Sequence, residues 1–242
     1  VDGKERPATW MNAVEDGRPI TPRTGYVVEI NALWYNAIKF YQQMLSETPG
    51  PENEIYAAEC EELAQKLQQS FKNVFLNEHG YLLDYVDGQM QDWSVRPNQI
   101  FAIALDFSPL DLKERKRVLD ICTRELVTPK GVRSLSPKSG GYNPLYVGPQ
   151  TQRDFAYHNG TAWPWITGFY LEAYLRIYKM SGVNFIERQL IGFEEEMTSH
   201  CIGSIPEVFD GNPPFKGRGA VSFAMNVAEI LRTLYLLSKY NY

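Results

Sequence analysis

Apolar residues recur with the period of an α-helix along most of this chain. From Val27 onward they form a stripe at a spacing of about 3.6 residues, made of Ile30, Trp34, Ala37, Ile38, Tyr41, Met44 and Leu45. A second stripe follows the break at Pro49-Gly50-Pro51, made of Tyr56, Cys60, Leu63, Leu67, Phe71 and Val74. This pattern predicts a pair of consecutive antiparallel helices.

Further helices are predicted over residues 97–105, 108–127, 161–180, 184–200 and 219–240. Pro97 stands at a first-turn position, and Ser108, with Asp111 at the third position after it, is typical of a helix start. Asn184 is expected to cap the fourth of these helices. The last helix is expected to turn one face inward, and that face carries Phe223, Val227, Ile230, Leu231 and Leu234.

The pattern of helices and loops favours an all-α fold. Only the segment from Tyr81 to Val86 resembles a strand, and we expect it to be half of a small ribbon. The loop from Pro129 to Asp154 is long, and such a loop in a compact domain is usually functional. Consecutive helix pairs with one functional end suggest an α/α toroid, in which an inner ring of helices surrounds a pocket. We expect residues 1–242 to be a single domain cut from a longer protein, because Val1 is not an initiator and the predicted helices leave one unpaired.

Composition narrows the class of protein. With 44% hydrophobic and 22% charged residues, the chain is typical of a globular protein. The net charge is −5 and the basic residues are dispersed, which argues against partners such as nucleic acid or a membrane surface. Cys60, Cys122 and Cys201 lie far apart in predicted helices, so we expect buried thiols in a reducing, cytoplasmic compartment. No metal site is expected, because no second His or Cys lies at ligand spacing from His158.

Five stretches at expected helix ends mix aromatic residues with amides and charges. They are Thr9–Asn12, Glu29–Asn36, Arg96–Gln99, Tyr157–Trp165 and Pro206–Gly211. Four of the five tryptophans fall inside them, namely Trp10, Trp34, Trp163 and Trp165. A site for a neutral polyhydroxylated ligand needs flat apolar faces, bidentate hydrogen-bonding groups and one or two carboxylates. These stretches supply all three, so they predict a carbohydrate site.

Glu207 is the strongest catalytic candidate. Pro206 before it and Gly211 after it make a rigid loop, which suits a general base that activates water. The alternative is a glutamate that caps a helix or forms a salt bridge. His158 could act as an acid or base or bind a hydroxyl group, although a lone histidine is more often structural. Arg96 could bind sugar, but a buried arginine that pairs with loop carbonyls or with Asp92 fits the pattern equally well.

These stretches, together with Thr21–Gly25, resemble the amylo-α-1,6-glucosidase part of glycogen debranching enzymes, and they occur in the family's order. The similarity covers nearly the whole chain. It implies the C-terminal part of an (α/α)6 barrel, with the remainder of the barrel N-terminal to Val1. It also implies an inverting glycoside hydrolase that cleaves the α-1,6-linked glucose at branch points of glycogen or another branched α-glucan, without a cofactor.

The resemblance assigns a role to each matching residue. The family's general base falls on Glu207, and its general acid, the aspartate that closes Thr-Trp-Met-Asp, falls on Asn12. An amide cannot deliver a proton, and the loss of a positioned acid typically costs a factor of about 10²–10⁴ in rate. The carboxylates that could replace it are Glu29, Asp92 and Asp154. The substrate-binding residues implied are Trp10, Glu29, Trp34, Arg96, Gln99, His158 and Trp163.

Two other functions remain open. Asn12 favours a non-catalytic or degenerate α-glucan-binding domain, because the acid position is substituted. A sugar epimerase on a similar barrel would want paired histidines in its pocket, and the three histidines of the chain, His79, His158 and His200, look unsuited to that role.

Overall fold

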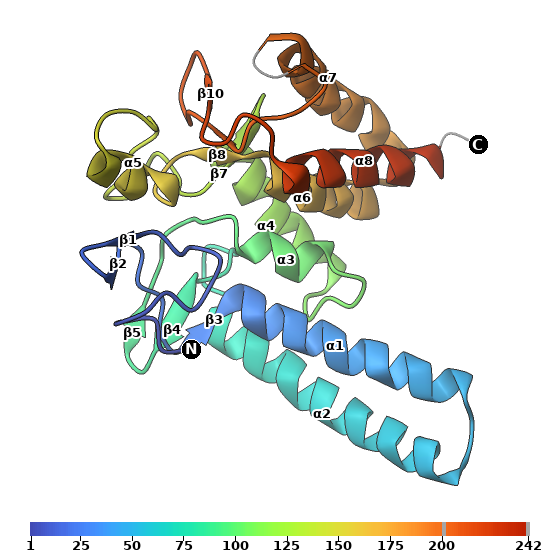
Figure 1. Cartoon of the computed structure of the whole chain (residues 1–242). Coiled ribbons are helices and arrows are strands. Elements are labelled where there is room, and N and C mark those ends of the chain that lie inside the picture. Colours follow the sequence, from blue (N-terminus) through green and yellow to red (C-terminus); the bar gives the residue numbers. More distant parts are fainter. Residues whose placement is uncertain (200–201, 241–242) are drawn as a thin grey trace.

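The computed structural model describes residues 1–199 and 202–240. It is a stack of helices, with loops and short strands gathered at the left-hand end of Figure 1. The helices are α1 (Val28–Glu47), α2 (Pro51–Phe75), α3 (Gln99–Ala104), α4 (Leu112–Glu125), α5 (Gln150–Tyr157), α6 (Pro164–Tyr178), α7 (Val183–Ser199) and α8 (Ala224–Ser238), with a 3₁₀ turn at Lys179–Gly182. The predicted helical architecture is confirmed.

The helices form two layers. In one layer α1 contacts α3, α3 contacts α6, and α6 contacts α8. In the other, α2 packs on α1, α4 packs on α3 and α6, and α7 packs on α6. The starts of α1, α3, α6 and α8 all lie toward the end that carries the loops, and α1 and α8 stand at the two ends of the row (Figure 1). This arrangement presents the segments before these helices on one side of the molecule.

The all-α prediction is wrong in one respect, because the loops at this end pair into small sheets. One sheet has the order β10-β9-β8-β7-β6, with β6 at Val127–Thr128, β7 at Gly131–Arg133, β8 at Ala162–Trp163, β9 at Val208–Phe209 and β10 at Gly217–Arg218. Another joins β3 (Tyr26–Val27), β4 (Tyr85–Asp87) and β5 (Met90–Gln91), and a third joins β1 (Val14–Glu15) and β2 (Arg18–Pro19). Strands of two or three residues are too short to show alternating polarity in a sequence.

Several predicted boundaries also move. α4 begins at Leu112, because Asp111 and Glu114 form a capping box there, and Ser108 bonds to the carbonyl of Ala102 instead. Asn184 lies inside α7 rather than at its cap. The predicted ribbon exists, but its strands are β4 and β5, and Tyr81 precedes them. The predicted long loop contains β7 and the start of α5.

The core lies around α3 and α6. Every residue of α3 is buried, and so are Ile166, Tyr170 and Leu171 of α6. Among the described helices, none is long and apolar enough to cross a membrane. Cys60 and Cys122 are buried free thiols, as expected, whereas Cys201 and His200 lie outside the described residues.

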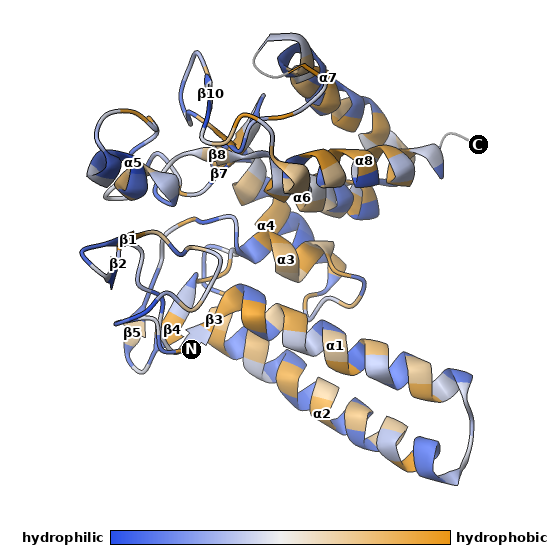
Figure 2. Cartoon of the chain, in the orientation of Figure 1, coloured by the Kyte–Doolittle hydropathy of each residue, from blue (hydrophilic) through white to orange (hydrophobic). Residues whose placement is uncertain are grey.

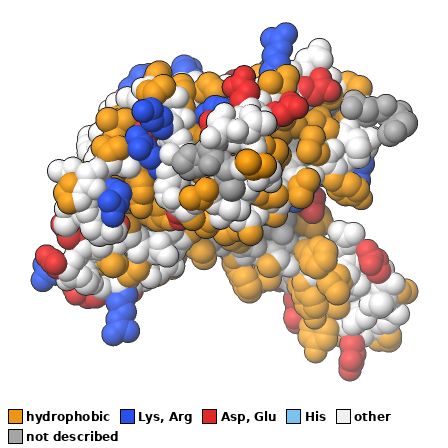
Figure 3. Space-filling view, turned by 45° about the horizontal axis from the view of Figure 1, so that its top comes forward, with side chains coloured by type: hydrophobic (Ala, Val, Ile, Leu, Met, Phe, Trp, Pro, Cys, Tyr) orange, Lys and Arg blue, Asp and Glu red, His pale blue; other side chains and the backbone are white. Residues whose placement is uncertain are grey.

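The two end helices carry apolar residues on more than one face, as the hydropathy colouring in Figure 2 shows. On α8 the prediction was wrong for Leu231 and Leu234, which are 60% and 48% exposed. On α1 the exposed apolar residues are Ile30, Leu33, Trp34, Phe40, Tyr41 and Met44. Figure 3 shows apolar side chains along the projecting hairpin of α1 and α2. The outer faces of the row are therefore unusually apolar for a protein surface.

Candidate functional site

The indole of Trp10 joins three of the five predicted stretches. It meets the rings of His158, Trp163 and Trp165 edge-on, with ring centroids 5.1, 5.4 and 5.2 Å away. Its Nε1 donates a hydrogen bond of 2.7 Å to Oδ1 of Asn98. Edge-to-face contacts of this kind are favourable aromatic packing. Segments far apart in the sequence thus meet at one side chain.

A buried group of charges lies beneath this indole. The guanidinium of Arg23, which is 2% exposed, forms two hydrogen bonds with Glu29 and also donates to both carboxylate oxygens of Asp84, at 2.7 and 3.0 Å. Asp84 in turn accepts a hydrogen bond of 2.7 Å from Asn98. Bidentate pairing satisfies the buried charges. Glu29 therefore has an internal partner, and its stretch is tied to the Asn98 stretch through Arg23 and Asp84.

Arg96 and Gln99 are also held inside the protein. Arg96 is 8% exposed and donates to the carbonyls of Ser134 and His158, at 3.2 and 2.7 Å. Gln99 accepts from the amide of Leu82 and donates to the carbonyl of Arg96. Of the two interpretations of Arg96, pairing with loop carbonyls is the one observed, and its nearest carboxylate is Asp84 at 3.9 Å rather than Asp92. Arg96 and Gln99 thus support the site from behind.

His158 is buried and neutral. Burial and the nearby guanidinium groups of Arg96 and Arg23 lower its pKa to about 3. Its Nε2 accepts a hydrogen bond of 3.1 Å from the main-chain N–H of Asn12, so the ring proton is assigned to Nδ1. The ring stacks on Trp163 at 5.5 Å. His158 therefore anchors the main chain of Asn12, and its lowered pKa keeps the imidazole uncharged near neutral pH.

Glu207 lies just before β9 and is half-buried. One carboxylate oxygen accepts a short hydrogen bond from the hydroxyl of Tyr157, and the other accepts one of 2.8 Å from the main-chain N–H of Ala220. A side chain at Gly219 would collide with this carboxylate, and Gly219 has a φ of +72° that favours glycine. The carboxylate is therefore held from two sides, in a place that a glycine keeps open.

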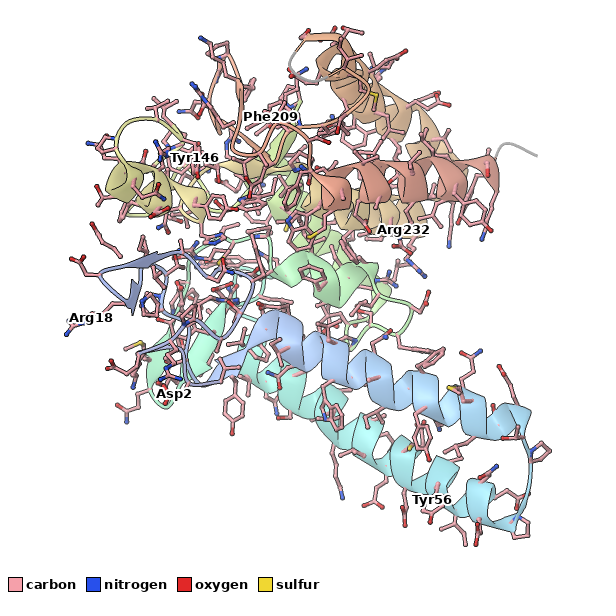
Figure 4. The ribbon with its side chains drawn as sticks, in the orientation of Figure 1. Asp2, Arg18, Tyr56, Tyr146, Phe209 and Arg232 are labelled. Carbon is pink, nitrogen blue, oxygen red and sulfur yellow. The ribbon has the colours of Figure 1, made fainter. Side chains whose placement is uncertain are left out.

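Tyr157 and His158 connect the carboxylate of Glu207 with the main chain of Asn12. Burial and the hydrogen bond to Glu207 raise the pKa of Tyr157 well above its usual range, so its hydroxyl stays a donor. The ring of Tyr146 lies 5.6 Å from that of Tyr157, and Figure 4 places Tyr146 beside α5. Because Tyr157 and His158 are consecutive, a single peptide separates the group that holds Glu207 from the group that holds Asn12.

The remaining predicted site residues differ in the solvent exposure of their side chains. The side chain of Asn12 is exposed, whereas its main chain is tied to His158. Trp163 is 4% exposed and donates through Nε1 to the carbonyl of Tyr157, so it packs inside rather than offering an open face. Trp34 is 52% exposed on α1, outside the aromatic cluster around Trp10. Trp10 is partly buried.

The three carboxylates proposed to replace the acid lie in different surroundings. Glu29 is paired with Arg23, and Asp92 accepts from the main-chain N–H of Ser94 at the end of the β4–β5 ribbon. Asp154 is half-buried on α5, three residues before Tyr157 and thus on the same side of the helix. Both Asp154 and Glu207 act on Tyr146, whose pKa is raised by burial and by these two charges. Of the three, Asp154 lies beside the partner of Glu207.

One hollow completes the geometry of this end of the molecule. A hollow of about 580 Å³ lies between the β1–β2 ribbon and α5, lined by Glu15, Asp16, Arg18, Pro19, Ile20 and Phe155. Figure 4 shows Arg18 on this ribbon, at the same end of the molecule as Tyr146. Within residues 1–199 and 202–240, no group of three or more His, Cys, Asp or Glu side chains could hold a metal ion.

Sequence reasoning missed Arg23, Asp84, Tyr157 and Gly219 as parts of the site. Arg23 and Tyr157 lie within stretches that the sequence had already marked, but their partners are 61 and 50 residues away in the chain. Gly219 directly follows β10, and nothing in the sequence indicates that the side chain of Glu207 lies beside it. Only the folded loops bring these pairs together.

The sequence of this chain matches a known protein family. A model of the amylo-alpha-1,6-glucosidase family matches residues 1–232. The glycogen debranching enzyme of Saccharomyces cerevisiae (strain ATCC 204508 / S288c) is 28% identical over 207 residues, which is 69% of this chain. The chain spans only 13% of the length of that relative.

Solved structures show a likeness of fold. Neutral trehalase Nth1 from Saccharomyces cerevisiae matches with a TM-score of 0.66 at 15% sequence identity, over 86% of this chain and 37% of the trehalase. A sialidase matches with a TM-score of 0.65 at 14% identity, over 92% of this chain and 21% of the sialidase. At such identities the likeness concerns the arrangement of helices alone.

Proposed function

Because the chain belongs to the amylo-alpha-1,6-glucosidase family, as its motifs predicted, we propose that the intact protein hydrolyses α-1,6-linked glucose at branch points of glycogen or a similar α-glucan. The family and the debranching relative support a glycoside hydrolase domain. The observation that carries the finer proposal is the Glu207 carboxylate, held by Tyr157 and Ala220 in a loop beside the Trp10 cluster.

In this mechanism Glu207 is the general base. It takes a proton from a water molecule, whose oxygen attacks the anomeric carbon on the face opposite the leaving group, so the configuration inverts. The hydroxyl of Tyr157 fixes the carboxylate so that its remaining lone pairs can face the water. The buried group of Arg23, Glu29 and Asp84 supports the loops from behind.

We assign the proton donor to Asp154. An inverting pair of carboxyl groups stands about 6.5–9.5 Å apart, on either side of the scissile bond. Asp154 shares a face of α5 with Tyr157 and accepts a hydrogen bond of 2.7 Å from Gln150, which orients it. Glu29 and Asp92 are engaged elsewhere. Asp154 would protonate the glycosidic oxygen as the bond to the anomeric carbon breaks.

The second candidate function is a non-catalytic α-glucan-binding domain. It is favoured by Asn12, which stands where the family is expected to carry its acid. The two candidates differ in whether glucose is released, and not in the kind of ligand that binds.

The apolar outer faces support an (α/α)6 barrel that is larger than this chain. A groove of about 460 Å³ between α7 and α8 is lined mainly by apolar side chains, including Leu190, Phe193, Ile230 and Leu234. Further helices of the same barrel, N-terminal to Val1, would cover this groove and the exposed face of α1. The helical fold that the chain shares with the trehalase supports this assignment. The buried free thiols of Cys60 and Cys122 accord with a cytoplasmic location.

The test is the turnover of a branched α-glucan by the intact protein. Glu207→Gln should lower kcat by about 10²–10⁴ while leaving KM nearly unchanged, because the base acts in the transition state. Glucose released by the parent should first appear as the β-anomer, which proton NMR detects. A Glu207→Gln variant with the parent's kcat would refute the base assignment.

The proton donor is tested in parallel. Asp154→Asn should lower kcat within the same range, whereas Asp120→Asn, at an exposed position on α4, serves as a surface control. Asn12→Asp should add little activity if Asp154 is the donor. A gain of one to two orders of magnitude, roughly within the general-acid range, would instead show that the parent lacks a positioned acid.

A further inference from the structure

A hollow with aromatic walls lies outside the Glu207 site. It has a volume of about 470 Å³ and is lined in part by the rings of His79, Tyr81 and Trp93. The rings of His79 and Tyr81 lie parallel within 13°, and Trp93, which is 43% exposed, stands edge-on to His79 at 6.1 Å. The hydroxyl of Tyr81 donates to the carbonyl of Trp93 and fixes the pair. Three adjacent rings thus line one hollow.

The polar side of this hollow carries one anion and two cations. Glu125 is 6% exposed and accepts from Ser136 at 2.9 Å and from Lys138 at 2.6 Å. Arg124 lies 3.5 Å from the same carboxylate and is 66% exposed at its side chain. The anion offsets one of the two cations, and solvent screens the remaining positive charge because the side chains of Arg124 and Lys138 are 66% and 76% exposed. The hollow therefore has several hydrogen-bond donors but only a weak field for an anion. Aromatic faces beside such donors suit a neutral sugar.

The hollow is linked to the main site through a short piece of chain. Ser134 accepts from the amide of Gly160 and, through its carbonyl, from Arg96. Two residues on, the side chain of Ser136 forms part of the hollow. Two extended residues span at most about 7 Å. The same short segment therefore contacts the loops of the Glu207 site and lines this hollow.

We propose that the hollow at Trp93 is a second carbohydrate subsite, which binds an outer segment of the same α-glucan chain that is cut near Glu207. This proposal rests on the proposed function for the identity of the ligand. Trp93 and Tyr81 pack against the apolar faces of glucose units, while Arg124 and Lys138 donate to their hydroxyl groups. The subsite gives affinity for long chains and takes no part in the chemistry.

The test measures binding without turnover. In intact protein carrying Glu207→Gln, calorimetry with maltose and with maltoheptaose should give a chain-length preference. Trp93→Ala should weaken maltoheptaose binding about 3–10-fold, the effect of losing an aromatic contact, with little change for maltose. Trp93→Tyr should retain most of the affinity. Tyr56→Ala, which removes an aromatic that is 48% exposed on α2, is the matched control.

The position of the ligand is read by hydrogen exchange. Maltoheptaose should slow amide exchange in residues 77–81 and 136–139, and Trp93→Ala should abolish that protection. Protection confined to residues around Glu207, or unchanged affinity in Trp93→Ala, would overturn the subsite. Binding of inorganic phosphate that weakens with salt would overturn the neutral-sugar assignment. Because no arm depends on catalysis, a failure of the Glu207 mechanism would leave these results interpretable.

Discussion

His158 and Tyr157 have roles in this protein that their residue types do not predict. His158 is the sort of residue expected to move protons, yet the structure makes it a buried acceptor for the N–H of Asn12. Tyr157 is the sort of residue expected to pack, yet its hydroxyl holds the carboxylate of Glu207. In both cases the partner, and not the side chain itself, determines the role.

The buried state of His158 predicts a stability that depends on pH. The unfolded histidine titrates near about 6.5, whereas the native pKa is lowered to about 3. Between these values the unfolded state binds a proton that the native state does not. The free energy of unfolding should therefore fall as pH drops through this window, by at most about 1.4 kcal/mol per pH unit.

Urea titrations of the parent and of His158→Gln measure this contribution. Glutamine keeps an acceptor for Asn12 but does not titrate, so its free energy of unfolding should fall less steeply below about pH 6. Above pH 7 the slopes should coincide, because histidine is neutral in both states there. Identical slopes of parent and variant at low pH would contradict a depressed pKa.

Removing the hydroxyl of Tyr157 tests whether it positions Glu207. Tyr157→Phe keeps the ring beside Tyr146 but loses the hydrogen bond to the carboxylate. On a branched α-glucan, kcat should fall by about 10–100-fold with little change in KM, since a misplaced base affects the transition state. Tyr170→Phe is the matched control, because the hydroxyl of Tyr170 also forms a hydrogen bond, with Thr123 in the core. This change should leave kcat unaltered. Equal losses in both variants would indicate a purely structural effect.

At the scale of elements, periodicity predicted the helices and could not predict the strands. The stripes of α1, α2 and α8 extend over many turns, so their period is readable, whereas β8 and β9 are two residues each and pair only through Ala162 and Phe209. α5 is short and polar, and nothing in its sequence separates it from the loop before it. Short strands and helices that depend on partners far away in the sequence therefore cannot be predicted from a local sequence pattern.

The start of α4 gives a prediction about stability. The side chain of Asp111 accepts from the amide of Glu114, and the side chain of Glu114 accepts from the amide of Asp111. Asp111→Ala leaves an amide of the first turn without its partner, so the free energy of unfolding should fall by about 0.5–2 kcal/mol. Chemical denaturation measures it. Ser108→Ala, at the cap that the sequence suggested, provides the comparison, and a larger effect there would contradict the observed boundary.

At the scale of the whole molecule, sequence motifs identified the family and the loops, but not which of their side chains face outward. Glu29 and Gln99 looked like ligands for sugar because they stand in marked stretches, yet both are buried against other loops. The five stretches predicted from the sequence therefore contain two kinds of residue: some are exposed at the candidate site, and others are buried and support its loops. Distinguishing them requires the partners Arg23 and Leu82, which only the three-dimensional structure supplies.

The exposed apolar groove of α8 predicts how the chain associates. Leu234 is 48% exposed beside Leu190 and Ile230, and large apolar patches on a surface favour association. Sedimentation of residues 1–242 should reveal self-association that Leu234→Lys reduces. In the intact protein, where we propose that further helices cover the groove, the same change should lower the free energy of unfolding by about 1–3 kcal/mol. No destabilisation of the intact protein would contradict that covering.

At position 12 the main chain, and not the side chain, makes the hydrogen bond to His158. Protein stability and catalytic activity should therefore depend differently on the residue at this position. Every residue except proline at position 12 has the main-chain N–H that donates to His158, and the side chain of Asn12 is exposed. Replacing Asn12 should therefore leave thermal stability nearly untouched, so a screen for folded or soluble variants would not register a change there. Sequence drift at position 12 would be invisible to selection for folding and visible only to selection on the reaction. A library randomised at this codon and sorted by glucose release, rather than by expression, would map which groups the reaction accepts.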